Sequence, residues 1–124
     1  MKHLKRIFEK VWRYDEDSFL KFLYDLDSIG DEIKASYDGS ECGSSFGYEF
    51  DETDDSLIVE FGYSGYSDGF SRTMKIFYNH YMGPTKVVST ESGSNPYGSW
   101  DDSETEEFDS YDEIITDIRG HLGL

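Results

Sequence analysis

The chain has 124 residues, of which 27 are acidic and 11 are basic, so its net charge at pH 7 is -16. Aromatic residues make up 17%, which excludes a disordered acidic tail, because such tails lack the apolar surface needed to offset the entropy of ordering. This length is typical of one domain with a single core, and we expect residues 1–124 to form one acidic domain.

The charge is unevenly distributed along the chain. Residues 1–13 carry five bases and one acid, a local +4, which leaves 6 bases and 26 acids, or -20, for residues 14–124. Such a surface repels nucleic acid and anionic membranes, and it favours a basic protein or divalent cations. An acidic surface that serves only solubility is the alternative interpretation.

Two helices are expected at the N-terminus, on either side of the acidic run 15–17, which offers an N-cap to the second. Apolar residues at helical spacing indicate the first helix, namely Leu4, Ile7, Phe8, Val11 and Trp12. The same spacing indicates the second, through Phe19, Phe22, Leu23 and Leu26. Either Gly30 ends that helix, or Ser28 with Asp31 starts one more turn through Ile33 and Tyr37.

Period-two alternation of apolar side chains then predicts strands. Residues 45–63 are expected to form a β-hairpin whose acidic tip is the run 51–55. A third strand is expected at 70–81, and a short fourth strand at 85–89 after a Gly-Pro turn.

Residues 90–109 are polar and show no periodicity, and they predict a long loop. A C-terminal helix follows, with Ser110 and Glu113 as a capping box and with Gly120 or Gly123 at its end. Together the elements predict an α+β fold, in which two N-terminal helices and one C-terminal helix pack on a four-stranded antiparallel meander sheet.

Catalytic and metal-binding patterns are missing from the sequence. It contains neither a nucleophile elbow nor a phosphate-binding loop, and its only cysteine, Cys42, lies near carboxylates that would raise a thiol pKa. The histidines His3, His80 and His121 have no zinc spacing, and calcium loops beginning at Asp25 or Asp51 lack the required final glutamate. We therefore expect neither enzymatic activity nor a cofactor or bound metal.

Three segments combine carboxylates with aromatic rings, which is typical of surfaces that bind basic proteins, namely 48–55, 63–68 and 97–108. Rigid rings bury much area at little entropic cost, while carboxylates select basic partners. The candidate partner-binding residues are Asp51, Glu52, Asp54, Asp55, Tyr63, Tyr66, Asp68, Tyr97, Trp100, Asp101, Asp102 and Glu104.

In its size, acidity, single-domain α+β pattern and lack of catalytic groups, the chain resembles the immunity proteins of bacterial contact-dependent growth inhibition and related polymorphic-toxin systems. The resemblance covers overall character without a fixed motif, so it assigns no residue roles. It implies a protein that occludes the active or substrate-binding site of a basic toxin, often a nuclease. A nucleic-acid mimic acting on a host enzyme and a non-inhibitory adaptor domain are the alternatives, and a homo-oligomer remains open.

The opening residues MKHLKRIFEKVW lack the apolar stretch of a secretory signal, and no run is long and apolar enough to span a membrane. A lone cysteine is compatible with a reducing compartment. We therefore expect a cytoplasmic protein.

Overall fold

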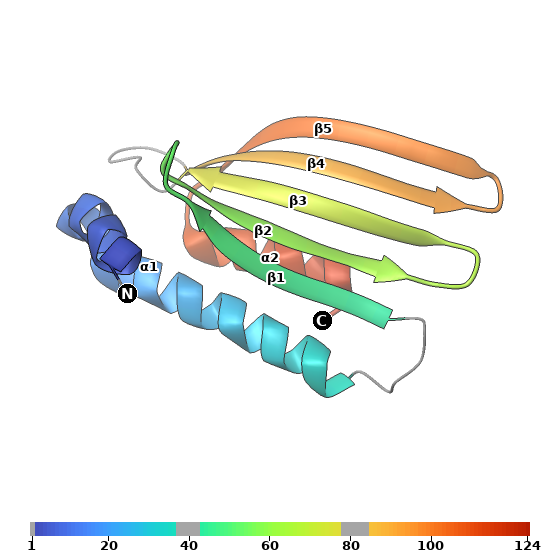
Figure 1. The fold of residues 1–124 in the computed structure, drawn as a ribbon, viewed down its shortest axis with the longest axis horizontal. Helices are drawn as coiled ribbons and strands as arrows, with labels where there is room; N and C mark the ends of the chain where they lie inside the picture. The colour runs from blue at the N-terminus through green and yellow to red at the C-terminus, as the bar shows by residue number, and fades with distance from the viewer. Residues whose placement is uncertain (1, 37–42, 78–84) are drawn as a thin grey trace.

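A computed structural model describes residues 2–36, 43–77 and 85–124, with side chains from residue 18 onward. Within these ranges an antiparallel meander sheet of order β1-β2-β3-β4-β5 is accompanied by two helices, which lie against the same face of the sheet (Figure 1). The elements are α1 (Lys2–Ser36), β1 (Gly43–Asp51), β2 (Ser56–Ser64), β3 (Gly69–Phe77), β4 (Thr85–Asn95), β5 (Gly98–Phe108) and α2 (Tyr111–Leu122). The expected α+β class is confirmed.

Helix α1 is one continuous helix, so the expected division at residues 15–17 is wrong. Aspartate and glutamate are tolerated inside helices, and neither proline nor glycine interrupts this stretch. The helix also continues past Gly30, because its apolar face goes on beyond that residue. Buried residues along this face are Phe19, Phe22, Leu23, Leu26, Ile29 and Ile33.

The predicted hairpin is confirmed, and both of its strands contribute side chains to the core. Strands β1 and β2 pair with Phe46 opposite Phe61 and Tyr48 opposite Val59. Between the sheet and the helices, the core is completed by buried apolar side chains from β2, β3, β4 and α2, namely Leu57, Val59, Phe61, Met74, Ile76, Val87, Ile114, Ile115 and Ile118.

Polar contacts hold the two helices in place. Tyr48 of β1 donates a hydrogen bond of 2.6 Å to Asp27 of α1. The helices are joined by ion pairs between Lys21 and Asp112, at 2.9 Å, and between Arg119 and Glu32, at 2.6 Å. The ring of Tyr111 also stacks on Phe22 at a centroid distance of 4.8 Å.

The long loop expected at 90–109 is wrong, because these residues form the second half of β4, a tight turn and β5. The sheet therefore has five strands rather than four. The turn Asn95-Pro96-Tyr97-Gly98 places asparagine, proline and glycine where a β-turn favours them. Asn95 accepts a 2.8 Å hydrogen bond from the backbone N–H of Tyr97, and Gly98 has a φ of +152°.

The C-terminal helix is confirmed, and Ser110 is its N-cap, accepting a 3.3 Å hydrogen bond from the backbone N–H of Glu113. Its C-cap is Gly123, with a φ of 72°, and not Gly120. Tyr37, Cys42, His80, the expected strand end at 78–81 and the Gly-Pro turn lie outside the described residues. No helix in the described part of the chain has the length and apolar character that crossing a membrane requires.

Candidate partner-binding surface

The sheet separates the predicted binding residues into groups at its two ends. The turn between β1 and β2 lies at one end, and the β2–β3 and β4–β5 turns lie beside each other at the other (Figure 1). The first end carries Asp51, Glu52, Asp54 and Asp55. The second end carries Tyr63, Tyr66, Asp68, Tyr97 and Trp100, while Asp101, Asp102 and Glu104 continue along β5. The predicted residues therefore do not form one continuous patch.

The acids at 51–55 take part in their own turn. Asp51 accepts hydrogen bonds from the backbone N–H and the hydroxyl of Thr53, at 3.0 and 2.5 Å. Asp54 pairs with Lys75 and accepts a 2.6 Å hydrogen bond from Ser56. The contact with Lys75, and then that with Ser56, lowers the pKa of Asp54. These contacts satisfy the carboxylates of Asp51 and Asp54 within the chain, so neither requires a binding partner.

The opposite end gathers exposed aromatic rings. Tyr97 is 99% exposed and Tyr66 is 86% exposed, while Tyr63 and Trp100 are each 40% exposed. A cavity of about 330 Å³ opens beside two of them, Tyr63 and Trp100, on the helix-covered side of the sheet. We call it the Trp100 pocket, and its principal lining residues are Tyr63, Asp68, Phe70, Glu91, Trp100 and His121.

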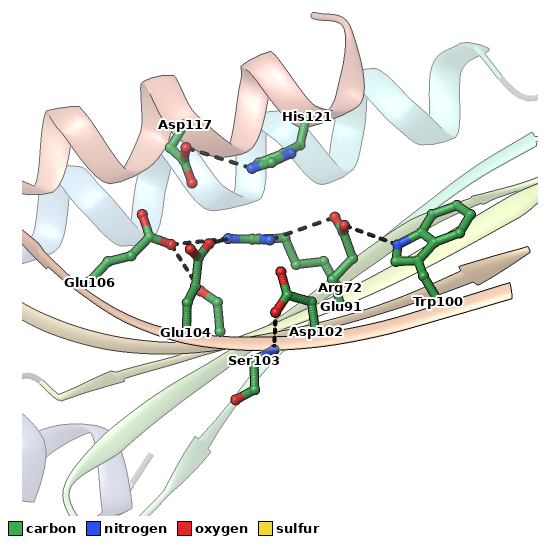
Figure 2. Close-up of polar contacts among 10 residues, drawn as sticks. Arg72, Glu91, Trp100, Asp102, Ser103, Glu104, Glu106, Asp117 and His121 are labelled. Carbon is green, nitrogen blue, oxygen red and sulfur yellow. Dashed lines mark hydrogen bonds and ion pairs between the residues drawn. The ribbon is translucent and has the colours of Figure 1, made fainter.

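Trp100 is held in this pocket by its neighbours on β4. It lies directly opposite Gly93 across the β4–β5 ladder. A Cβ atom at Gly93 would lie only 2.7 Å from Cε2 of the indole, so the ring packs over the glycine backbone. The indole Nε1–H also points to Glu91, at 3.4 Å (Figure 2).

Behind Trp100 lies a buried arginine surrounded by carboxylates. Arg72 is 5% exposed, and its side chain runs between the sheet and α2 (Figure 2). One terminal nitrogen lies 2.9 Å from Glu104 and 3.0 Å from Glu106, both on β5, and the other lies 3.6 Å from Glu91. We call these four residues, together with Asp117 and His121 of α2, the Arg72 cluster.

Helix α2 adds a further carboxylate to this cluster. Asp117 Oδ1 lies 3.6 Å from Nε2 of His121. The second oxygen of Asp117 and the Nε of Arg72 are buried without a hydrogen-bond partner. The charges around Arg72 are thus only partly matched, with one arginine facing several acids.

The pKa values in the cluster reflect this imbalance. Burial lowers the pKa of Arg72, but the hydrogen bond to Glu104 and the charges of Glu106 and Glu91 more than offset it, so the value lies above its ordinary range. The Arg72 contact holds the pKa of Glu104 below its usual value. Burial, and then hydrogen bonding with Glu104, raises the pKa of Glu106. Glu106 is thus the more readily protonated of the two coupled carboxyls.

Sequence reasoning missed Arg72, Glu91 and Glu106. A signal was present, because Arg72 occupies an inward position in the period-two pattern of β3, between Phe70 and Met74. An arginine at a core position requires buried carboxylate partners. Nothing local indicated that those partners would come from β4 and β5.

The residues of β5 alternate between the two faces of the sheet. Asp102 and Glu104 share the helix-covered side with Trp100, whereas Asp101 faces the other side. There it lines a polar depression of about 510 Å³ with Ser71, Thr73 and Thr90. Among the residues that the structure describes, no three histidine, cysteine or carboxylate side chains are grouped so as to hold a metal ion.

Comparisons with protein families, curated proteins and solved structures found no match to this chain. Its function must therefore be inferred from the surface itself.

Proposed function

We propose that this chain is an immunity-type protein that binds and neutralises a basic toxin, a nuclease, through β5 and the adjoining aromatic end of the sheet. The observation that supports it is the composition of β5, an edge strand of the meander. Between residues 101 and 107 it carries five carboxylates, and Trp100 precedes them with 40% of its surface exposed.

The acids of β5 are only partly neutralised by cations in the described part of the chain. Lys86 lies opposite Glu107 across the ladder, and Arg72 contacts Glu104 and Glu106, so that Asp101 and Asp102 have no ion-pair partner among the described residues. Elsewhere, Lys21, Lys75 and Arg119 are paired with acids of their own regions. A strong negative field therefore extends from this edge, and such a field accelerates encounters with basic surfaces about 10- to 1000-fold.

Exposed carboxylates also determine which partners the edge accepts. An open edge strand presents unpaired backbone groups, and charged side chains keep identical edges from pairing with one another. A basic partner experiences attraction where a second copy of this strand experiences repulsion. The neighbouring tyrosines and tryptophan supply the rigid apolar contacts on which binding energy commonly concentrates.

Inhibition in this proposal needs no chemical step by the chain. A nuclease cleft binds phosphates with lysine and arginine, and a row of carboxylates can occupy the same groups. The chain then acts by steric and electrostatic occlusion, without a cofactor and without contacting nucleic acid. We propose the cytoplasm as its location, because a nuclease toxin acts on nucleic acid there.

The proposal is tested by finding whether a neighbouring gene encodes a toxin domain and by co-expressing that domain with the chain. Growth should be protected, and the purified chain should inhibit the toxin's nuclease activity at a one-to-one ratio. Failure to bind the toxin and failure to protect cells together refute the proposal.

Two charge-reversal variants then locate the binding face. Asp101→Lys with Asp102→Lys changes β5, and Glu49→Lys with Glu52→Lys makes the same charge change near the β1–β2 turn. Association measured by stopped flow at low salt should slow about tenfold or more in the first variant and much less in the second. Equal slowing would indicate long-range charge alone, and a larger effect of the second pair would move the face to the other end.

A further inference from the structure

The Trp100 pocket combines aromatic walls with carboxylates in a single cavity. Tyr63, Phe70 and Trp100 come from three different strands, and Asp68 and Glu91 lie among them. Aromatic faces attract cations through their quadrupole, and the attraction strengthens where water is displaced. Carboxylates beside such rings add charge and hydrogen-bond acceptors. This lining favours an organic cation over an anion or a wholly apolar group.

The charges behind the pocket also favour binding of a cation in the pocket, in addition to Arg72. Glu91 sits between Arg72 and Trp100 and contacts both, at 3.6 and 3.4 Å (Figure 2). On the far side, Arg72 is already engaged at 2.9 and 3.0 Å by Glu104 and Glu106. Arg72 therefore leaves Glu91 only partly neutralised toward the open side of the pocket.

The pocket is preformed rather than assembled on binding. Packing over Gly93 keeps the indole of Trp100 in place, and three strands of one sheet support the surrounding rings. Preorganised rings lose little conformational freedom when a ligand enters. The cavity volume of about 330 Å³ is sufficient for one long side chain.

We infer that the Trp100 pocket receives an arginine side chain of the basic partner, with the guanidinium stacked on Trp100 and hydrogen-bonded to Glu91. Arginine fits better than lysine, because its planar group can stack on a ring while its edge donates to carboxylates. The inference rests on the proposed function for the origin of the arginine. The preference of the pocket for a guanidinium can be tested without any partner.

The test uses Nα-acetyl-L-argininamide as the probe and the full-length chain labelled with ¹⁵N. The indole N–H resonance of Trp100, assigned with a Trp100→Phe variant, should shift on titration, with a dissociation constant on the order of millimolar. Nα-acetyl-L-citrullinamide, which has a similar shape but no charge, should cause at most a small shift. No shift with the arginine probe, or equal shifts with both probes, would overturn the inference.

Matched variants connect the binding to the pocket. Glu91→Gln and Trp100→Ala should each weaken binding of the probe about fivefold to tenfold, measured in both variants from the backbone amide shifts of Asp68 and Asn95, because Trp100→Ala lacks the indole resonance. Glu60→Gln removes the same charge as Glu91→Gln but from an exposed position on the other face of the sheet, and should leave binding within about twofold. Gly93→Ala should displace the indole and weaken binding while all charges remain. Weakening by Glu60→Gln equal to that by Glu91→Gln would overturn the inference, because a general charge effect would then suffice.

The same variants separate this inference from the proposed function. If the toxin binds the wild-type chain and the Glu91→Gln and Trp100→Ala variants equally well, the pocket does not receive a partner arginine, although the proposed function stands. If the probe binds as expected while the toxin does not bind at all, the guanidinium pocket stands and the proposed function fails.

Discussion

Replacing Arg72 by methionine should destabilise the fold strongly at neutral pH. Methionine fills much of the volume of the arginine stem but removes the charge that Glu104 and Glu106 contact at 2.9 and 3.0 Å. Removing one partner of a fully buried ion pair costs about 3–5 kcal/mol. The side chains of Glu104 and Glu106 are 51% and 28% exposed, so water screens part of this effect. We therefore expect a loss of about 2–3 kcal/mol at pH 7.

The loss should depend on pH in a defined direction. The folded-state pKa of Glu104 is depressed below its ordinary value of 4.5, chiefly by Arg72. Its contribution to stability is therefore present above about pH 4.5 and is lost as the pH falls through the folded-state value. The variant lacks this contribution at every pH. The difference in unfolding free energy between wild type and variant should shrink on acidification.

Urea unfolding followed by far-ultraviolet circular dichroism measures this difference, with the slope in urea checked for constancy between variants. Lys75→Met on the same strand is a suitable control, because Lys75 is one-third exposed and its loss should cost much less than that of Arg72. The Arg72 substitution should also cost much less in a chain that carries Glu104→Gln and Glu106→Gln. A loss that is the same at pH 7 and pH 4, or that persists in that background, would show that packing rather than charge stabilises this region.

Three other substitutions test separate parts of the structure. Glu106→Gln should raise the unfolding free energy at pH 7 relative to wild type, because burial raises the pKa of Glu106 and penalises its charged form. This gain should fade as the pH falls below 4.5, because the wild-type carboxyl is then protonated in both the folded and the unfolded state. Ser110→Ala should lower the unfolding free energy by about 1 kcal/mol through loss of the α2 N-cap, and an unchanged urea midpoint would contradict that role. Phe22→Ala should cost about 3–5 kcal/mol, because the ring is 1% exposed and stacks on Tyr111; a thermal or urea midpoint within error of wild type would show that this contact contributes little.

The candidate site was only partly predictable. The sequence singled out Tyr63, Asp68 and Trp100 through the proximity of aromatic and acidic residues, and these three residues share one cavity. It also singled out Asp51 and Asp54, whose contacts are with Thr53 and Ser56 of their own turn and with Lys75 of β3. Composition alone could not distinguish acids that stabilise a turn from acids that line a cavity, because the distinction depends on neighbours remote in sequence.

The sequence by itself determined the elements whose stability is local. Alternating apolar residues defined the β1–β2 hairpin, and Ser110 with Glu113 marked the start of α2, because strand alternation and helix capping act within a few residues. Tertiary structure alone decided that residues 98–108 form a strand. Their inward positions include Trp100, Glu104 and Glu106, which show no apolar alternation. The strand is held by pairing with β4 and by Arg72, 32 residues before Glu104 in the chain. A buried charge from a distant strand can stabilise an acidic strand, and no local pattern records that contact.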